Sequence, residues 1–353
     1  MLPTVPEVVL ASKSTPVHVE ALDGLRGVAA ISVMLYHAWV GNSHGWMAVD
    51  FFFCLSGFVL ALAYERKLSA GLSVSRFMSW RVIRIYPMLF IGGVFGLILW
   101  RSGEGAAYLA TASASNFLLA YIAHLLLFPY FGGHKAYPFN NVQWSIFYEL
   151  LVNIVYALLI PVLKFRILFA IVIASGLLLA LRAFQIGTVN LGFELDHLDV
   201  ALARTIFSFF LGVLLYQLRD TLTQHLPRVS FWWLAAVLLV LASLHSLNHP
   251  FASMEPLRQI ITIELINPAI ILLALICITR GPLVRWLGVL SFPLYAIHAP
   301  LVLYAQAVFE PMFAGVMLKA AMLSACAPIV GLSLLLGYFI DLPLNRLRRR
   351  VFK

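Results

Sequence analysis

The chain has 353 residues, of which 62% are hydrophobic and only 11% are charged. With a mean hydropathy of +0.94, this composition excludes a soluble globular protein. Apolar stretches of about 20 residues, the length of a membrane-spanning helix, recur along almost the whole sequence, whereas a membrane barrel would show short alternating strands. We therefore predict an all-α fold, a polytopic bundle of transmembrane helices.

Ten of these stretches are predicted to cross the bilayer, with boundaries accurate to several residues. They are 24–41, 46–64, 84–100, 144–163, 167–183, 200–217, 231–247, 260–279, 287–308 and 313–340. The segment 106–128 is less apolar, since Asn116, His124 and several hydroxyl residues interrupt it. Counting it as a crossing would invert every later loop, so we expect it to be re-entrant or interfacial.

The net charge of +9 is explained by the distribution of the 24 Lys and Arg residues. If the N-terminus is inside, most of them fall on the cytoplasmic side. The exceptions are Arg101, Lys135, Arg182, Arg204, Arg258 and Lys319. The positive-inside rule thus predicts that both termini lie in the cytoplasm. We expect a bacterial inner-membrane location and no nucleic-acid partner. Cytoplasmic tails at 1–20 and 346–353 would flank a membrane domain at 21–345.

The three cysteines, Cys54, Cys277 and Cys326, are isolated in apolar stretches and form no CxxC or Cys/His pattern. We expect them to be small core residues. The sequence predicts neither a metal site nor a bound cofactor.

The first predicted span carries two ionisable residues, Arg26 and His37. Eleven helical positions return to nearly the same face about 16 Å further along the axis. One face would then hold a cation near the inner surface and an imidazole deep in the bilayer. Because such groups are costly in hydrocarbon, an ionisable residue at membrane depth indicates a functional site.

The second predicted span begins with a carboxylate, Asp50, just inside the outer surface. The short connection at 42–45 makes this helix an antiparallel neighbour of the first. Asp50 would then orient His37 and raise its basicity, as the third member of a catalytic triad does. The alternative is that Asp50 only caps the start of its helix.

Arg76, Arg81 and Arg84 lie in the cytoplasmic segment between the second and third spans. Arg81 and Arg84, at positions i and i+3, share one helix face. Paired guanidinium groups suit phosphate oxygens, because each can make bidentate hydrogen bonds. The alternative is an ordinary positive-inside loop that binds lipid head groups.

Ser145, Glu149 and Asn153 follow at four-residue spacing and make a polar stripe that enters the membrane from outside. A carboxylate there is costly, so we expect Glu149 to face the interior of the bundle. The alternative is that Glu149 forms a structural ion pair with Arg204 or Arg182.

In the ninth predicted span, Ser291, Tyr295 and His298 share a helix face. Pro293 and Pro300 free backbone carbonyls there, which is tolerated only where protein or a wet cavity supplies partners. This pattern is typical of residues that line a cavity.

Together these motifs resemble those of the acyltransferase family 3 membrane proteins, which modify surface glycans and other extracellular acceptors. The resemblance covers residues 20–340. Its motifs are Asp23-Gly-Leu-Arg26-Gly with His37 at the family's Arg-x10-His spacing, Val49-Asp50-Phe-Phe-Phe-Cys-Leu-Ser-Gly57, Arg81-x-x-Arg84, Trp144-Ser-x-x-x-Glu149, and Ser291-Phe-Pro-Leu-Tyr-Ala-Ile-His298. The departures, at Ile146, Phe292 and Pro293, touch no ionisable position.

The resemblance implies transfer of an acyl group, most often acetyl, from cytoplasmic acyl-CoA to a hydroxyl outside, a glycan being the first expectation. The expected roles follow from it. CoA would be bound by Arg81, Arg84 and Arg76. The general base or acyl-carrying nucleophile would be His37, and the catalytic group would also include Arg26, Asp50 and Glu149. The substrate site would be lined by Ser145, Trp144, Ser291, Tyr295 and His298, and the donor to the oxyanion would be Tyr295, His298 or Ser145.

A second hypothesis is a proton-coupled transporter in which His37, Glu149 and Asp50 form a relay. Transporters of this size usually contain internal repeats, and none is visible in the sequence. A third is a scaffold or lipid flippase without chemistry. The sequence leaves open the acceptor, the acyl length and the oligomeric state.

Overall fold

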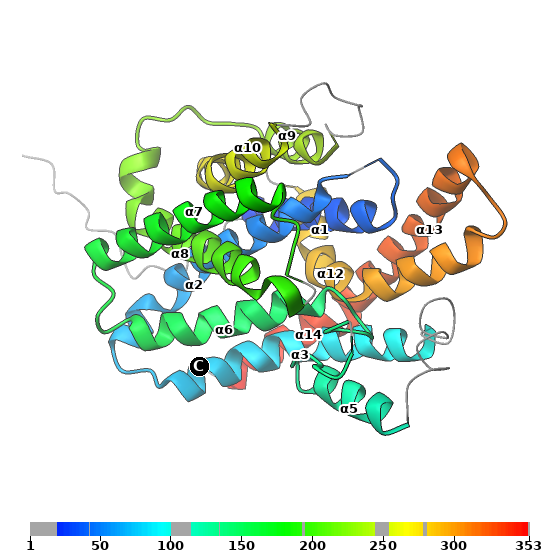
Figure 1. Cartoon of the computed structure of the whole chain (residues 1–353). Helices are drawn as coiled ribbons and strands as arrows, with labels where there is room; N and C mark the ends of the chain where they lie inside the picture. Colours follow the sequence, from blue (N-terminus) through cyan, green and yellow to red (C-terminus); the bar gives the residue numbers. More distant parts are fainter. Residues whose placement is uncertain are drawn as a thin grey trace, which may run out of the picture.

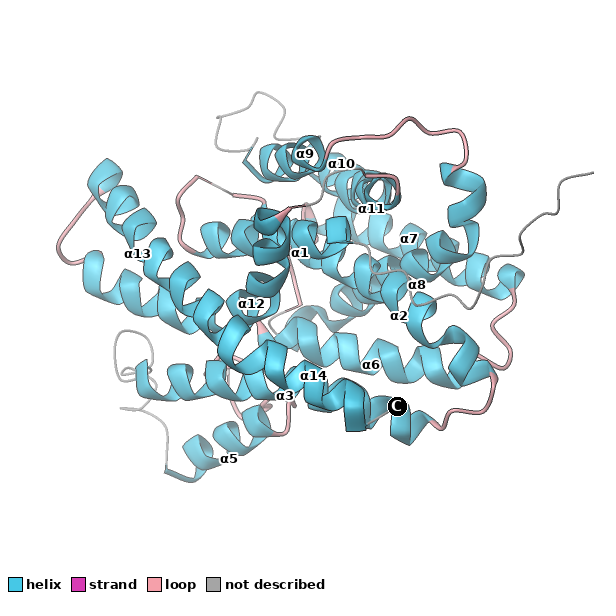
Figure 2. Ribbon diagram, turned by 180° about the vertical axis from the view of Figure 1, so that it is seen from behind, coloured by secondary structure: helices cyan, strands magenta, loops and turns pink. Residues whose placement is uncertain are grey.

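A computed structural model of the chain describes residues 20–41, 43–99, 114–133, 135–192, 195–243, 254–277 and 281–351. Every regular element in these ranges is a helix (Figure 2), which confirms the all-α prediction. The helices are α1 (Glu20–His37), η1 (Gly45–Met47), α2 (Ala48–Ser69), α3 (Val74–Leu99), α5 (Ala114–Leu125), α6 (Gln143–Leu159), α7 (Phe165–Ile186), η2 (Leu195–His197), α8 (Leu198–Thr223), α9 (Phe231–Ser243), α10 (Glu255–Ile261), η5 (Thr262–Ile266), α11 (Asn267–Leu275), α12 (Pro282–Phe309), α13 (Gly315–Leu336), η6 (Gly337–Asp341) and α14 (Leu342–Val351).

Seven of the described helices are long and apolar enough to cross a membrane. They span Gly45–Ser69, Val74–Leu99, Phe165–Ile186, Leu198–Thr223, Glu255–Leu275, Pro282–Phe309 and Gly315–Arg348. Helices α1, α6 and α9 match three further predicted spans but are shorter or carry more charge. The protein is thus a polytopic helical membrane protein, while the count of ten crossings stays a prediction.

Two boundaries differ from the sequence-based prediction. The segment of Arg76 to Arg84 is the start of the long helix α3, so these arginines extend from a spanning helix and not from a separate loop. At the other end of the chain, residues assigned to a tail from 346 onward belong to helix α14, which runs to Val351.

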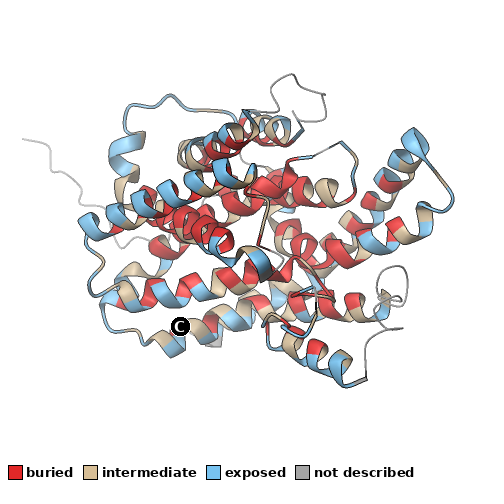
Figure 3. Cartoon of the chain, in the orientation of Figure 1, coloured by how far each residue is buried: buried red, intermediate tan, exposed pale blue. Residues whose placement is uncertain are grey.

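The centre of the bundle is formed by α1 packed along α12 and by α2 packed along α8 (Figure 1). Colouring by burial places the buried side chains in these central helices (Figure 3). Glycines let the backbones approach closely: a Cβ on Gly27 would lie 2.2 Å from the carbonyl oxygen of Leu287, and one on Gly57 would lie 1.9 Å from that of Phe209. Small residues at helix contacts are a common device in membrane bundles. The close α1–α12 contact sets the site described next.

Candidate active site

His37 is the last residue of α1, and the helix ends there in a Schellman motif. The amide of Val40 donates to the carbonyl of Leu35 at 3.4 Å, and the amide of Trp39 donates to that of Tyr36 at 3.1 Å. Trp39 has a φ of +56°, the left-handed conformation that this motif requires and that a bulky residue rarely adopts. His37 therefore ends α1, four residues before the predicted end of the first span at 41, and its depth in the bilayer stays a prediction.

The imidazole of His37 faces that of His298 on α12. Their ring centroids are 5.3 Å apart, and the ring planes are tilted by 43°. His298 is fully buried. The tautomer of His298 follows from its surroundings, because Nδ1 lies 3.0 Å from both the Leu294 and the Tyr295 carbonyl oxygens and must carry the proton that they accept.

The second ring nitrogen of His298, Nε2, is buried and has no hydrogen-bond partner among the described residues. With the proton on Nδ1, Nε2 presents a lone pair. In this tautomer Nε2 can only accept a hydrogen bond, while Nδ1 donates to the backbone. The expected role of His298 as an oxyanion donor stays a prediction.

The prolines of α12 create the local geometry, as the sequence predicted. Pro300 has no amide hydrogen, so the carbonyl of Ala296 loses its helical partner. The side-chain amide of Asn140 replaces that partner and donates to Ala296 at 2.8 Å. Further along α12, the side-chain amide of Gln306 donates to the carbonyl of His37 at 2.8 Å. The first contact holds the interior of α12, where His298 lies, and the second holds the end of α1, where His37 lies.

Tyr295 and Ser145 bring α12 and α6 together through their hydroxyls, which lie 2.5 Å apart. The Ser145 hydroxyl donates to the carbonyl of Val142 at 3.0 Å, so Tyr295 is the donor to Ser145. Ser291, expected on the same face, instead donates to the carbonyl of Gly288 within its own helix. Two of the three predicted α12 residues therefore belong to the site.

Asp50 is paired with Arg204 of α8, and the expected contact with His37 is not made. Both carboxylate oxygens accept from the guanidinium, at 3.1 and 2.6 Å, and the two side chains are almost completely buried. Arg204 also donates to the carbonyl of Leu191 and lies between the rings of Trp46 and Trp144. The helix-start alternative is retained in part, since Asp50 lies in the first turn of α2 and its carboxylate also accepts from its own backbone amide.

Glu149 is held by Arg81 and Ser56. Arg81 Nη2 and the Ser56 hydroxyl both donate to Oε1 of Glu149, at 2.7 and 2.8 Å. The alternative pairings with Arg204 or Arg182 are thus wrong, since Arg204 binds Asp50 and Arg182 binds Asp199.

The other arginines predicted to bind phosphate also have partners. Arg84 pairs with Asp341 at 2.6 Å and lies over the ring of Phe292, 5.0 Å from its centroid. Arg26 pairs with Asp23 at 2.9 Å. Arg26, Arg81 and Arg348 all interact electrostatically with Arg84, so the four guanidinium groups form one cluster, in which Arg26, Arg81 and Arg84 each pair with a carboxylate. Arg76 is exposed and stacks on Trp80.

The arginine cluster and the histidine pair are linked by two helices. On α12, Phe292 contacts Arg84 and His298 contacts His37, six residues or about 9 Å along the axis. On α6, Glu149 binds Arg81 and Ser145 binds Tyr295, four residues or about 6 Å apart. A cationic end and an imidazole end thus form one continuous site.

Comparison with known proteins identifies the family of this chain. The family model described as an acyltransferase domain, that of acyltransferase family 3, matches residues 19–339. The chain belongs to this acyltransferase family. The match includes every residue of the site except Asp341 and Arg348.

Two relatives agree with this assignment. "Protein 2 in picA locus" of Rhizobium radiobacter is 33% identical over 168 residues, which are 41% of this chain and 84% of that protein. The provisionally named membrane-bound transacylase BcsY of Komagataeibacter xylinus is 30% identical over 168 residues, 44% of this chain and 42% of that protein. The second match thus covers less than half of BcsY. No solved structure matches the chain.

In this membrane acyltransferase, sequence reasoning missed four residues that hold the site: Arg204, Asn140, Gln306 and Asp341. One of them left a signal. Arg204 lies near the start of its helix, at the same predicted outer depth as Asp50, and opposite charges at one depth are natural partners. Asn140 and Gln306 serve backbone carbonyls and carry no comparable pattern.

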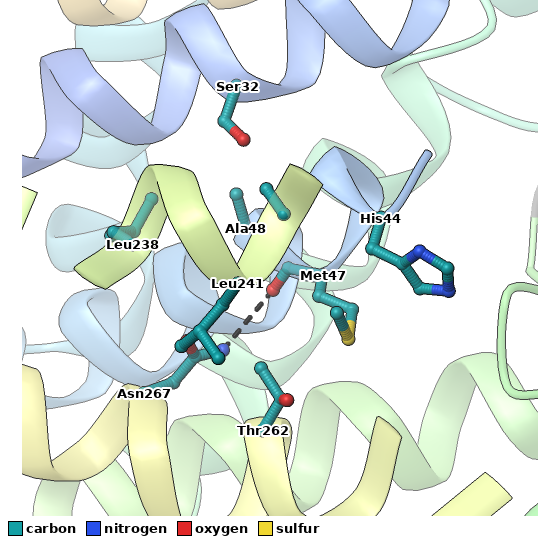
Figure 4. Close-up of a pocket in the computed structure, with 9 residues that line it drawn as sticks. Ser32, His44, Met47, Ala48, Leu238, Leu241, Thr262 and Asn267 are labelled. Carbon is teal, nitrogen blue, oxygen red and sulfur yellow. Dashed lines mark hydrogen bonds between the residues drawn. The ribbon is translucent and has the colours of Figure 1, made fainter. Parts of the chain in front are cut away.

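The acyltransferase site is closed by packing, since Tyr295 is 7% exposed and His298 is fully buried. A separate small pocket lies between α1, η1, α9 and the α10–α11 segment (Figure 4). It is lined by Ser32, His44, Met47, Thr262 and Asn267, among others, and is close to the smallest size that can hold one water molecule. His298 is thus enclosed by packing, whereas His37 is half-buried.

Proposed function

We propose that this membrane acyltransferase moves an acyl group, with acetyl as the first candidate, from cytoplasmic acyl-CoA to a hydroxyl of an acceptor outside the cytoplasm, such as a surface glycan. The observation that carries the proposal is the continuity of the site along α6 and α12. Along α12, the residue that contacts Arg84 and the histidine that contacts His37 lie about 9 Å apart. One acyl-CoA molecule, whose pantetheine arm joins its phosphates to its thioester, would therefore contact both ends.

The cationic cluster supports binding of the CoA phosphates. A guanidinium has five N–H donors, and the carboxylates at Arg81 and Arg84 use only part of them. Nε of Arg81 is buried without a hydrogen-bond partner among the described residues. Phosphate oxygens would take these remaining donors, with Arg26 adding positive charge at the start of α1.

The histidine end would perform the transfer. His37 acts as general base and removes the proton of the acceptor hydroxyl while the oxygen attacks the thioester carbon. Tyr295, whose proton now goes to Ser145, turns to the oxyanion and donates to it. Asp50 stabilises the packing around the site through its ion pair with Arg204 and takes no proton. An acyl-histidine intermediate is the competing route, and trapping labelled acyl-enzyme would reveal it.

The main test uses a deletion strain complemented at matched protein levels. Proton NMR measures the O-acetyl content of the surface polysaccharide. The wild type should restore it, while His37→Ala should lower the rate at least about 100-fold. The control is His225→Ala, which removes an exposed histidine. Equal restoration by His37→Ala would show that His37 is not the general base. No restoration by the wild type would show that the polysaccharide is not the acceptor, and would favour the transporter hypothesis.

The donor is tested separately with purified protein. CoA at about 100 times its dissociation constant should stabilise the fold by about 2.7 kcal/mol, visible as a higher unfolding temperature. Arg81→Ala combined with Arg84→Ala should remove this shift, whereas Arg228→Ala, at an exposed arginine outside the cluster, should keep it. A shift that survives the double substitution would place the CoA site elsewhere.

A further inference from the structure

We infer that His298 is the proton partner of His37, so that the two imidazoles work as one unit during acyl transfer. This inference rests on the proposed function and adds to it a residue and a route for the proton. It is carried by the fixed tautomer of His298, by its unpartnered Nε2 and by the neighbouring ring of His37.

The first step concerns the tautomer. Nδ1 of His298 lies 3.0 Å from two backbone carbonyl oxygens of its own helix. Carbonyl oxygens only accept hydrogen bonds, so the proton resides on Nδ1. Backbone contacts thus hold the basic nitrogen, Nε2, in its unprotonated form.

The second step concerns the cost of leaving Nε2 without a partner. A buried acceptor without a hydrogen bond costs about 1 to 3 kcal/mol, and such atoms in native structures point to a functional state in which the bond is made. His298 is 0% exposed, and Nε2 has no partner among the described residues.

The third step identifies the partner. The titratable rings in contact with the pair are Tyr36, which packs against His37, and Tyr295, which packs against His298. In this arrangement the Tyr295 hydroxyl donates to Ser145, and Tyr36 packs against the ring of His37 and not against that of His298. Both nearby carboxylates, those of Asp50 and Glu149, are held by arginines. His37 is therefore the group that can deliver a proton to Nε2.

The proton route then balances as follows. The acceptor oxygen forms a bond to the acyl carbon and gives its proton to one nitrogen of His37. His37 passes the proton on its other nitrogen to Nε2 of His298, so that the positive charge is shared by two rings. The carbon–sulfur bond breaks, and the sulfur leaves with the bonding pair. One proton returns from the pair to the sulfur, which gives the neutral thiol and restores both imidazoles.

The test separates this role from a purely structural one. His298→Asn keeps a donor at the position of Nδ1, and so keeps the backbone contacts, but removes Nε2. We measure the thiol released from acetyl-CoA by membrane vesicles that contain the natural acceptor, for the wild type, His37→Ala, His298→Asn and the double variant. His124→Asn, at a buried histidine of α5, is the matched control. Thermal unfolding of the purified variants reports folding.

We expect His298→Asn to lower kcat at least about 30-fold, with KM for acetyl-CoA and the unfolding temperature close to wild type, and His124→Asn to keep kcat. The double variant should be no slower than the slower single one, because residues that act as a unit are not additive. Three results would overturn this inference and leave the proposed function standing: a kcat of His298→Asn within threefold of wild type, a change confined to KM or to folding, or effects of the two substitutions that multiply in the double variant. A wild type that releases no thiol from acetyl-CoA or longer acyl-CoAs would overturn the proposed function and this inference with it.

Discussion

Asp50 with Arg204, and His37 with His298, are two buried polar pairs in one bundle, and they are built in opposite ways. In the first, both carboxylate oxygens and three guanidinium nitrogens have partners, and two tryptophan rings cover the cation. In the second, Nδ1 of His298 is held by the backbone, and Nε2 of the same ring has no hydrogen-bond partner among the described residues. A pair whose polar atoms are all hydrogen-bonded stabilises the fold, whereas a ring nitrogen without a partner can accept a proton during the reaction.

The strongest test of this contrast is Arg204→Met. Removing one partner of a buried ion pair leaves an uncompensated charge and costs about 3 to 5 kcal/mol. We expect a large fall in the unfolding temperature of the detergent-solubilised protein, and a substantial recovery when Asp50→Asn is added. Arg182→Met is the control, since its pair with Asp199 is partly exposed and should contribute at most about 1 kcal/mol. Equal effects of the two substitutions would contradict the contrast.

Tyr295→Phe tests the incomplete side of the comparison. It removes only the hydroxyl that donates to Ser145, so the fold should be retained. If this hydroxyl stabilises the oxyanion, turnover should fall about 100-fold or more. The control on the same helix is Tyr304→Phe, which removes an exposed hydroxyl and should leave turnover unchanged. Normal turnover of Tyr295→Phe would show that a group other than Tyr295 donates to the oxyanion.

A smaller effect is expected for Asn140→Ala, which connects folding to the histidine pair. The variant leaves the carbonyl of Ala296 without a partner, at a cost of about 1 to 3 kcal/mol. Because Ala296 precedes His298 by two residues, turnover should fall together with stability. Asn141→Ala, at the next position, should change both much less. Lower stability with unchanged turnover would show that the histidine does not depend on this contact.

The fold followed from the sequence more completely than the site did. Apolar length and the spacing of the motifs predicted the helical bundle, the family and the roles of Pro300 and Tyr295 as special positions of α12. The partner of Asp50 was not predicted, because neighbouring helices in sequence need not supply the nearest charge: α2 packs along α8, and Arg204 comes from there. Likewise the bond from Asp341 to Arg84 joins residues 257 positions apart, which no local pattern encodes.

The smallest effect is expected at Trp39, which ends α1 two residues after His37. A left-handed conformation costs an ordinary residue about 1 to 2 kcal/mol, and glycine avoids this cost. Trp39→Gly should therefore keep or raise stability and keep turnover, while Trp39→Val should lower both, because a β-branched residue fits this conformation worst. Leu127, the other described non-glycine residue with positive φ, is the control. Leu127→Val should lower stability but not turnover, because it lies in the loop after α5 and not beside His37. A Trp39→Val enzyme with full turnover would show that the end of α1 does not set the position of the imidazole, and the comparison of the two pairs would then rest on α12 alone.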